Sequence, residues 1–293
     1  MNWDDLRFIL AIEREGTLTA AAAELGVNHS TVSRRLAALE DEVGCRLFDR
    51  QPTGYVATDA GSDVVGVAQR VEEAVHSLDR RVIGRDTRLH GPVRLTTFDG
   101  LAVRHINLFQ AFQRRYPAIE LEISVENAPV SLTRREADVA LRLSNRPPEH
   151  LVGRKILRAE FALYGHRELV AEHGDELAAY PWLAWDERLG ARLTQEWMQQ
   201  HVPDAQIAAV IDSSALMIRS VQLGFGIQFL ICAEGDGHPD LVRLRPPEPG
   251  FGMDLWVLTH PDLRGTARVK AFMDHLYDGL REHADQYAGV LPD

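Results

Sequence analysis

Residues 17–36 read TLTAAAAELGVNHSTVSRRL. Thr17 is a good N-cap for a helix over LTAAAAEL, and Gly26 is a typical residue to end it. Asn28 can cap a second helix, whose apolar residues recur at spacings of four, three and four and are expected to form one buried stripe: Val32, Leu36, Leu39 and Val43. The stretch therefore predicts two short helices joined by a tight glycine turn.

A further helix precedes this pair, because Leu6, Ile9 and Leu10 fall at helical spacing before Gly16, which stops the helix. The last helix of the three carries polar residues off its apolar stripe: His29, Ser30, Thr31, Ser33, Arg34 and Arg35. This arrangement is typical of a helix-turn-helix, whose second helix enters the major groove and contacts bases and phosphates. The alternative is a plain helical hairpin with a solvated polar face.

A short hairpin is predicted next, in GCRLFDRQPTGYVATDAG at residues 44–61, because Leu47 and Tyr55 flank a Pro-Thr-Gly turn. A hairpin beside a recognition helix is a wing. In that position Arg50 and Thr53 would lie near the DNA backbone or the minor groove.

The overall charge limits how such a protein binds DNA. The chain holds 32 Lys and Arg against 43 Asp and Glu, a net charge of −11. This balance argues against a protein that coats nucleic acid or anionic membrane over its whole surface. The sequence also has no apolar signal core, no apolar run of the roughly 18 residues that span a bilayer, and only two cysteines far apart. We expect a cytoplasmic protein with one local basic contact face.

The segment from Leu6 to Gly61 resembles the N-terminal domain of LysR-type transcriptional regulators. Residues 27–34, VNHSTVSR, match that family's Val-Ser-Gln-Pro-Ala-Val-Ser-Arg. Further matches lie on both sides, in order and without gaps: Thr17, Ala21, Ala22, Leu25, Leu39, Glu40, Gly44, Leu47, Phe48, Arg50, Thr58, Ala60 and Gly61. Three residues of the recognition helix depart from the family pattern, His29, Ser30 and Thr31, so the operator sequence does not follow from the resemblance.

A long helix is predicted over residues 59–83, with Thr58 as its cap. Its apolar residues form a heptad seam: Val64, Ala68, Val71, Val75, Leu78 and Val82. A seam this narrow favours pairing with a second copy of the helix over packing on its own domain, which is the alternative. The resemblance implies the same, since LysR-type proteins dimerise through this helix, and it allows a homodimer or a homotetramer.

Strand and helix patterns alternate beyond Gly91-Pro92, which predicts an α/β domain with mainly parallel sheets. The resemblance implies two Rossmann-like lobes similar to periplasmic binding proteins. We therefore expect three parts: a winged helix-turn-helix over residues 1–58, a linker helix over 59–88, and an effector-binding domain of two lobes over 91–293.

An effector pocket is expected in the crevice between the lobes, where strands end and helices begin. The residues at such positions are Thr96, Thr97, Phe98, Asp99, Asn127, Ser213 and Ser214. In LysR-type proteins the matching positions commonly hold a small anion with hydroxyl groups. Asp99 stands where a hydroxyl is more usual, and its carboxylate would cap its own helix and repel a carboxylate ligand. We expect a neutral or cationic effector, or none.

Motifs for catalysis or cofactors are weak in this sequence. Gly224-Phe225-Gly226 lacks the third glycine of a dinucleotide fingerprint, the histidines lack metal-ligand spacing, and no G-x-S-x-G occurs. We expect no cofactor, no metal and no catalytic residue. The predicted function is a DNA-binding transcriptional regulator controlled by a small-molecule effector, with double-stranded DNA and RNA polymerase as implied partners and no membrane. The alternative is an effector-independent regulator whose C-terminal domain serves only oligomerisation.

Overall fold

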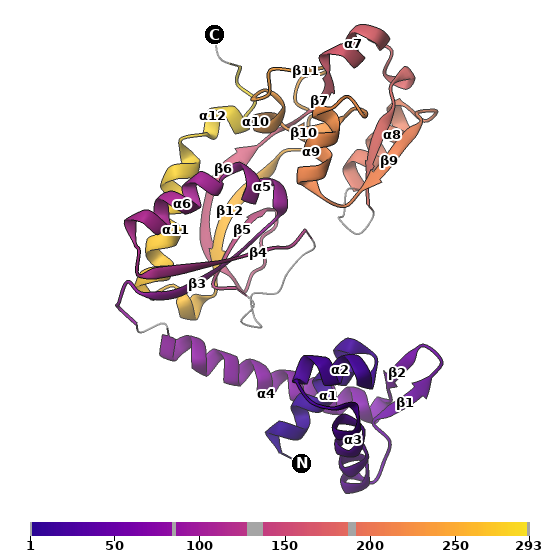
Figure 1. Cartoon of the computed structure of the whole chain (residues 1–293), viewed down its shortest axis with the longest axis vertical. Helices are drawn as coiled ribbons and strands as arrows, with labels where there is room; N and C mark the ends of the chain where they lie inside the picture. The colour runs from indigo at the N-terminus through magenta and orange to yellow at the C-terminus, as the bar shows by residue number, and fades with distance from the viewer. Residues whose placement is uncertain (1, 84–85, 128–136, 187–191, 292–293) are drawn as a thin grey trace. The chain divides into compact units, whose positions relative to one another are not determined.

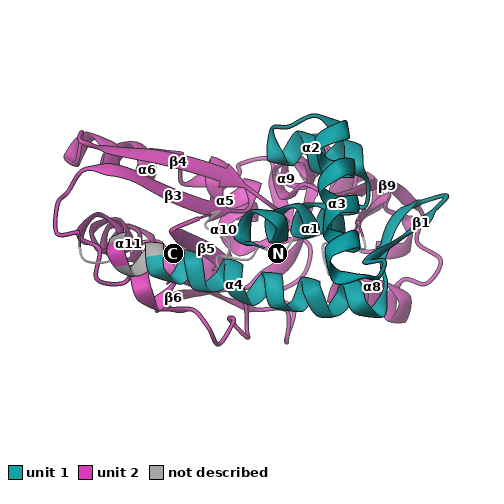
Figure 2. Ribbon diagram, turned by 90° about the horizontal axis from the view of Figure 1, so that it is seen from below, with its two compact units in different colours: residues 1–79 teal, residues 80–293 magenta. Residues whose placement is uncertain are grey.

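The chain folds as two compact units, residues 1–79 (unit 1) and residues 80–293 (unit 2), which Figure 2 colours separately. The computed structural model describes residues 2–83, 86–127, 137–186 and 192–291. Among these residues no helix is long and apolar enough to cross a membrane.

Unit 1 consists of helices and one hairpin, and its last helix continues into the start of unit 2 (Figure 1). Its elements are α1 (Trp3–Glu15), α2 (Leu18–Leu25), α3 (His29–Val43), β1 (Phe48–Gln51), β2 (Gly54–Ala57) and α4 (Asp59–Ile83). The predicted hairpin is confirmed, since β1 and β2 pair antiparallel with Gln51 opposite Gly54.

The predicted helix boundaries of unit 1 are confirmed where glycine ends a helix. Gly16 and Gly26 take φ values of 65° and 66°, a left-handed conformation that glycine adopts without steric cost. Thr17 caps α2, because its hydroxyl accepts a hydrogen bond from the N–H of Ala20 at 3.2 Å. Asn28 is the N-cap of α3, but its side chain makes no capping hydrogen bond.

The core of unit 1 joins the three helices to the first half of α4. Val32, Leu36 and Leu39 are buried as predicted, and they belong to one cluster with the apolar face of α1. Burying each such side chain stabilises the fold by roughly 1.5–3 kcal/mol. Val43 differs from the prediction, since it is 36% exposed. It is the last residue of its helix, where the chain turns away at Gly44.

The first lobe of unit 2 is built on a five-stranded sheet in the order β4-β3-β5-β12-β6. These strands are β3 (Gly91–Thr97), β4 (Ile119–Val125), β5 (Val139–Leu143), β6 (Val152–Ala159) and β12 (Met253–Thr259). The helices of this lobe are α5 (Asp99–Arg104), α6 (Ile106–Arg115), α11 (Ala267–Arg281) and α12 (Ala284–Tyr287), with a short 3-10 helix at Pro261–Leu263. Phe112 of α6 packs on Phe272 of α11 with ring centroids 4.7 Å apart, in the core that includes residues of the sheet.

The second lobe contains two small sheets, β10-β7-β11 and β8-β9. Its strands are β7 (Phe161–His166), β8 (Trp182–Trp185), β9 (Ile207–Ile211), β10 (Gln228–Ile231) and β11 (Leu241–Arg243). Its helices are α7 (Arg167–His173), α8 (Arg192–His201), α9 (Ser214–Gln222) and α10 (Cys232–Gly235), with a 3-10 turn at Leu177–Ala179. The chain enters this lobe after β6 and returns to the first sheet with β12.

The sheets of unit 2 are mixed, whereas mainly parallel sheets were predicted. β3 pairs parallel with β4 and β5, and β8 pairs parallel with β9, but β12 pairs antiparallel with β5 and β6. The helical segment after β3 is broken at His105 into α5 and α6. His105 is buried there, and its Nε2 lies 2.6 Å from the Tyr287 hydroxyl, so the break places a polar ring in the core with a partner.

Candidate functional site

The exposed face of α3 carries most of the predicted DNA contacts. Val32, Leu36 and Leu39 fix one side of the helix in the core. The opposite side therefore faces solvent, and the predicted contact residues His29, Ser30, Ser33 and Arg34 are all exposed, with Thr31 half-buried beside them. Because Asn28 makes no side-chain cap, the first N–H groups of α3 are not covered by the N-cap residue.

Arg34 and Arg35 are placed differently although they are neighbours. The Arg35 guanidinium pairs with the carboxylates of Asp4 and Asp5 at 3.2 and 2.9 Å, and it stacks over the ring of Phe8. Arg35 thus fastens α3 to α1, while its side chain remains 42% exposed. Among the described residues Arg34 is exposed and has no ion pair.

The wing is held against the rest of unit 1 by its turn. The N–H of Tyr55 donates to the carbonyl of Gly16 at 2.7 Å. Gly54 takes φ 136°, and a Cβ at this position would overlap the Gly16 carbonyl, so only glycine allows the contact. This contact leaves Arg50 and Thr53 exposed on the hairpin, as expected for residues that reach a DNA backbone.

The heptad seam of α4 is divided into two halves. Ala68 is fully buried in unit 1, and Val64 and Val71 pack against the same core, so this half is used within the chain. Arg14 of α1 also pairs with Glu72 of α4. Beyond this point the seam residues are exposed: Val75 by 39%, Leu78 by 56% and Val82 by 66%. The second half of the seam is the part that a partner helix could cover.

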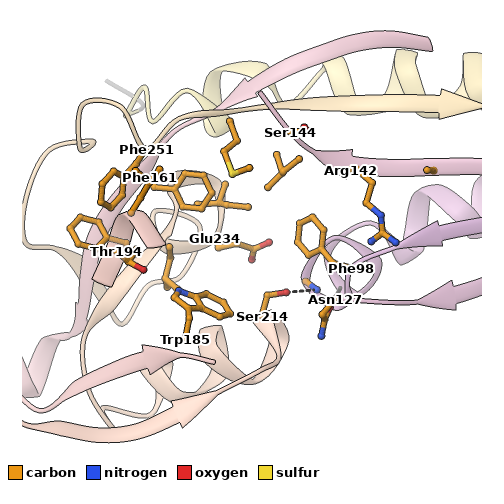
Figure 3. Close-up of a pocket in the computed structure, with 18 of the residues that line it drawn as sticks. Phe98, Asn127, Arg142, Ser144, Phe161, Trp185, Thr194, Ser214, Glu234 and Phe251 are labelled. Carbon is orange, nitrogen blue, oxygen red and sulfur yellow. Dashed lines mark hydrogen bonds between the residues drawn. The ribbon is translucent and has the colours of Figure 1, made fainter. Parts of the chain in front are cut away.

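A cavity of about 590 Å³ lies in unit 2, lined by residues of both lobes (Figure 3). Most of its wall is apolar, and five aromatic side chains contribute to it: Phe98, Phe161, Trp185, Phe229 and Phe251. The polar and charged side chains of the wall are Thr96, Asn127, Arg142, Ser144, Arg146, Thr194, Ser214 and Glu234. A large apolar cavity with a few polar groups is the usual form of a small-molecule site.

Four of the predicted effector residues line this cavity, namely Thr96, Phe98, Asn127 and Ser214. Asp99 and Ser213 lie directly behind the wall, where both are hydrogen-bonded to residues of the site. Thr97 differs from the prediction: its side chain is fully buried and takes no part in the wall. The side chain of a strand residue points to the opposite face from those of its neighbours, so Thr96 and Thr97 cannot both face the cavity.

Asp99 was expected to cap its own helix, but Phe98 is the N-cap of α5 and Asp99 is its first residue. Its carboxylate accepts a hydrogen bond from the N–H of Gly100 at 2.7 Å, and it also accepts from the N–H of Ser214 at 3.0 Å, across the crevice. The hydroxyls of Ser213 and Ser214 donate to it as well. Burial would raise the pKa of Asp99, but hydrogen bonds from these serines and Asn127 outweigh burial and lower it.

Three charged residues of the wall were not predicted: Arg142, Arg146 and Glu234. Arg142 donates to the Glu126 carbonyl and the Thr96 hydroxyl, both at 2.7 Å, and burial lowers its pKa. Glu234 pairs with Arg104 at 3.3 Å, and burial raises its pKa. Arg142 is the last residue but one of β5, and a position near the end of a strand could have indicated it. Glu234 lies in a four-residue helix with no sequence pattern to mark it.

Models of two protein families match the chain. The model described as bacterial regulatory helix-turn-helix protein, lysR family, matches residues 3–62, and the model described as LysR substrate binding domain matches residues 86–281. The second match covers two thirds of the chain. The two matches correspond to the helical unit with its wing and to the domain that holds the cavity.

Relatives over nearly the whole length are regulators. The chain is 26% identical to a probable HTH-type transcriptional regulator LtrA of Klebsiella pneumoniae, with 93% of each chain covered. It is 28% identical to a Mau operon transcriptional activator of Paracoccus denitrificans, with 90% of this chain and 91% of the relative covered.

Solved structures share the fold. The full-length virulence activator AphB of Vibrio cholerae matches with a TM-score of 0.58 at 20% identity, covering 95% of this chain and 99% of that one. CrgA of Neisseria meningitidis matches with a TM-score of 0.58 at 22% identity, covering 96% and 99%. Taken with the family models and the placement of α3, the wing and the cavity, these matches show that the chain belongs to the LysR-type family of DNA-binding transcriptional regulators.

Proposed function

We propose that this LysR-type regulator binds operator DNA as a homo-oligomer, a dimer or a tetramer, and that a small molecule in the unit 2 cavity modulates its activity. The exposed polar face of α3 is the observation that carries the DNA part of the proposal. That face follows a tight turn, is held rigidly by a buried stripe, and presents Arg34 to solvent. The proposal assigns the chain no enzymatic activity.

The DNA contacts divide between bases and backbone. His29, Ser33 and Arg34 approach base edges or phosphates in the major groove from the first two turns of α3, with Ser30 and Thr31 beside them. Arg50 and Thr53 approach the backbone or the minor groove from the wing. Arg35 acts indirectly, because its pairs with Asp4 and Asp5 orient α3 on α1.

The homo-oligomer forms through the exposed half of the linker seam. Val75, Leu78 and Val82 lie on one side of α4 and are left uncovered by unit 1. Pairing this stripe with a second copy would bury it and would bring two copies of α3 to one operator. Contact of the assembled regulator with RNA polymerase at the promoter follows from this arrangement. The function belongs in the cytoplasm, where bacterial DNA lies.

The effector part of the proposal rests on the cavity. Its volume of about 590 Å³ falls within the range of roughly 300–1,000 Å³ that is usual for small-molecule sites. Because residues of both lobes form the wall, a ligand there would contact both lobes and favour one arrangement of them. An effector-independent regulator is the competing account, and the same cavity would then stay without a ligand.

DNA binding by the full chain tests the proposal. Fluorescence anisotropy would be measured with labelled duplex from upstream of the chain's own gene and with unrelated duplex of equal length, at several salt concentrations. We expect tighter binding to the upstream duplex and an affinity that falls linearly with salt on logarithmic axes. Equal, weak binding to both duplexes would contradict the proposal. A saturable small molecule that changes this affinity would separate the effector-controlled account from the effector-independent one.

A further inference from the structure

The carboxylate of Asp99 links the two lobes of unit 2. Asp99 begins α5 in the first lobe, and Ser213 and Ser214 begin α9 in the second lobe. The carboxylate accepts from both serine hydroxyls and from the backbone N–H of Ser214. We call these three hydrogen bonds the Asp99 bridge.

The groups of the Asp99 bridge are those that would hold a free carboxylate. The N-terminus of a helix attracts anions, because its first N–H groups lack partners and its dipole is positive there. Gly100 and Asn127 add two more donors to Asp99, at 2.7 and 3.3 Å. A carboxylate offers about four acceptor positions, so five donors saturate it. A second anion at this place would find no free donor and a like charge.

The two lobes also meet closely at this point. The N–H of Gly100 donates to the Ser214 hydroxyl at 2.9 Å. A Cβ added to Gly100 would lie 2.7 Å from that hydroxyl, so a larger residue would displace the Ser214 hydroxyl from its place beside Asp99. Gly100 is thus the residue that allows α5 and α9 to touch and Asp99 to reach both serines.

We infer that Asp99 is the chain's own substitute for a ligand carboxylate. It holds the second lobe to the first through the Asp99 bridge, and it makes the cavity selective for apolar molecules that carry no anionic group at this end. The inference deepens the proposed function and rests on it, because the cavity concerned is the proposed effector site.

The rest of the cavity agrees with a ligand of this class. Figure 3 shows Phe98, Trp185 and Glu234 around the same space, with Phe161 and Phe251 at its far end. These rings offer a large apolar surface for the body of the ligand. Glu234 beside them is a carboxylate, which disfavours an anion near the centre of the cavity. Of the two cations of the wall, Arg142 is partly buried and donates to the Glu126 carbonyl and the Thr96 hydroxyl, and Arg146 is exposed to solvent.

Chemical rescue with formate tests the inference on the full chain. Asp99→Ala removes the carboxylate and leaves space and unpaired donors at the start of α9. Asp99→Leu removes the same acceptors but fills the space, and it is the matched control. The thermal unfolding midpoint of unit 2 would be measured for both variants and the wild type over a range of sodium formate concentrations, with sodium chloride at equal ionic strength.

We expect both variants to unfold at a lower temperature than the wild type. Formate should then raise the midpoint of Asp99→Ala saturably, by about 5 °C at one hundred times its Kd, and should leave Asp99→Leu and the wild type unchanged relative to chloride. An equal response of all three proteins to formate would overturn the inference, as would no response of Asp99→Ala. If Asp99→Ala folds only when formate is present, that result supports the inference.

Gly100→Ala is an independent test of the contact between α5 and α9. This variant keeps Asp99 but displaces the Ser214 hydroxyl from it, so the midpoint should fall and formate should not restore it. A midpoint equal to that of the wild type would contradict the close approach on which the bridge depends. These measurements need no DNA and no natural effector. Failure of DNA binding would therefore refute the proposed function while the formate result still decides the role of Asp99.

Discussion

Arg34 and Arg35 are adjacent in sequence, yet their surroundings differ: Arg34 is exposed with no ion pair among the described residues, and Arg35 pairs with Asp4 and Asp5. Arg34→Ala should weaken binding to operator DNA without changing the stability of unit 1. If Arg34 forks onto a guanine, the loss is about 1–3 kcal/mol, or roughly 5- to 150-fold in affinity. If it contacts a phosphate, affinity falls similarly for all sequences and the salt slope decreases by about 1.

Arg35→Ala should act on stability first. The variant removes the ion pairs with Asp4 and Asp5 and the contact with the ring of Phe8. Because the Arg35 side chain is 42% exposed, the pairs are largely solvated, and the total cost is about 1 kcal/mol. For a unit of this size the unfolding midpoint would fall by about 4–8 °C.

The assay measures both quantities on the same preparations. Anisotropy titrations at 15 °C, where both variants are folded, give the affinity at four salt concentrations, and scanning calorimetry gives the midpoint of unit 1. An Arg34→Ala variant that binds as tightly as the wild type at every salt concentration would refute the role of Arg34. An Arg35→Ala variant with an unchanged midpoint and a large loss of affinity would show that Arg35 contacts DNA directly.

Three further predictions concern the linker, the wing and Asp99. Leu78→Asp should dissociate the homo-oligomer without destabilising unit 1, since Leu78 is exposed in the single chain and would be buried only by a partner. Analytical ultracentrifugation at low protein concentration checks this, and an unchanged mass would contradict dimerisation through the seam. Gly54→Ala should loosen the wing, because its Cβ overlaps the Gly16 carbonyl, and hydrogen exchange at Tyr55 N–H should become faster. Asp99 has a lowered pKa in the fold, so its contribution to stability is present above its ordinary value of 3.8 and is lost as the pH falls below it; the stability difference between wild type and Asp99→Asn should shrink over that range in pH-dependent urea titrations.

Unit 1 was largely predictable because its structure is specified locally. Gly16 and Gly26 end helices by a backbone conformation that follows from the residue type, and the spacing of Val32, Leu36 and Leu39 fixes which face is buried. The different positions of Arg34 and Arg35 could not be predicted in the same way. They depend on where α1 places Asp4 and Asp5, thirty residues earlier in the chain.

The division of the linker seam shows a second limit of sequence patterns. The heptad spacing identifies a stripe that must be buried, but it does not say against what. Val64, Ala68 and Val71 satisfy the pattern by packing within unit 1, and Val75, Leu78 and Val82 satisfy it only if a partner is present. Packing within the chain therefore accounts for the first half of the seam, and pairing with a second copy is the proposal for the second half.

The strands of unit 2 were predictable where apolar residues run together, and not elsewhere. The sequence pattern of β6 is weak, because Arg154, Lys155 and Arg158 interrupt its apolar residues. All three side chains are exposed: Arg154 pairs with Asp274, whereas Lys155 and Arg158 share the carboxylate of Asp254. The sheet is mixed because β12 inserts between β5 and β6 and pairs antiparallel with both.

The sequence indicated where the cavity lies, but not which side chains interact there. Thr96, Phe98, Asn127 and Ser214 follow from the rule that ligands bind where strands end and helices begin. The link from Asp99 to Ser214 spans 115 residues of sequence, and no local pattern specifies it. Hydrogen bonds such as this one depend on how the two lobes pack against each other in the folded domain.

The most direct test of DNA recognition by an oligomer is a footprint of the full chain on DNA upstream of its own gene and its divergent neighbour. We expect two protected half-sites, separated by a whole number of helical turns, because two copies of α3 joined by α4 would face the same side of the duplex. Arg34→Ala should remove protection at both half-sites together. Protection of a single half-site would contradict the account. So would the absence of any protection at the highest concentration at which the wild-type protein stays in solution.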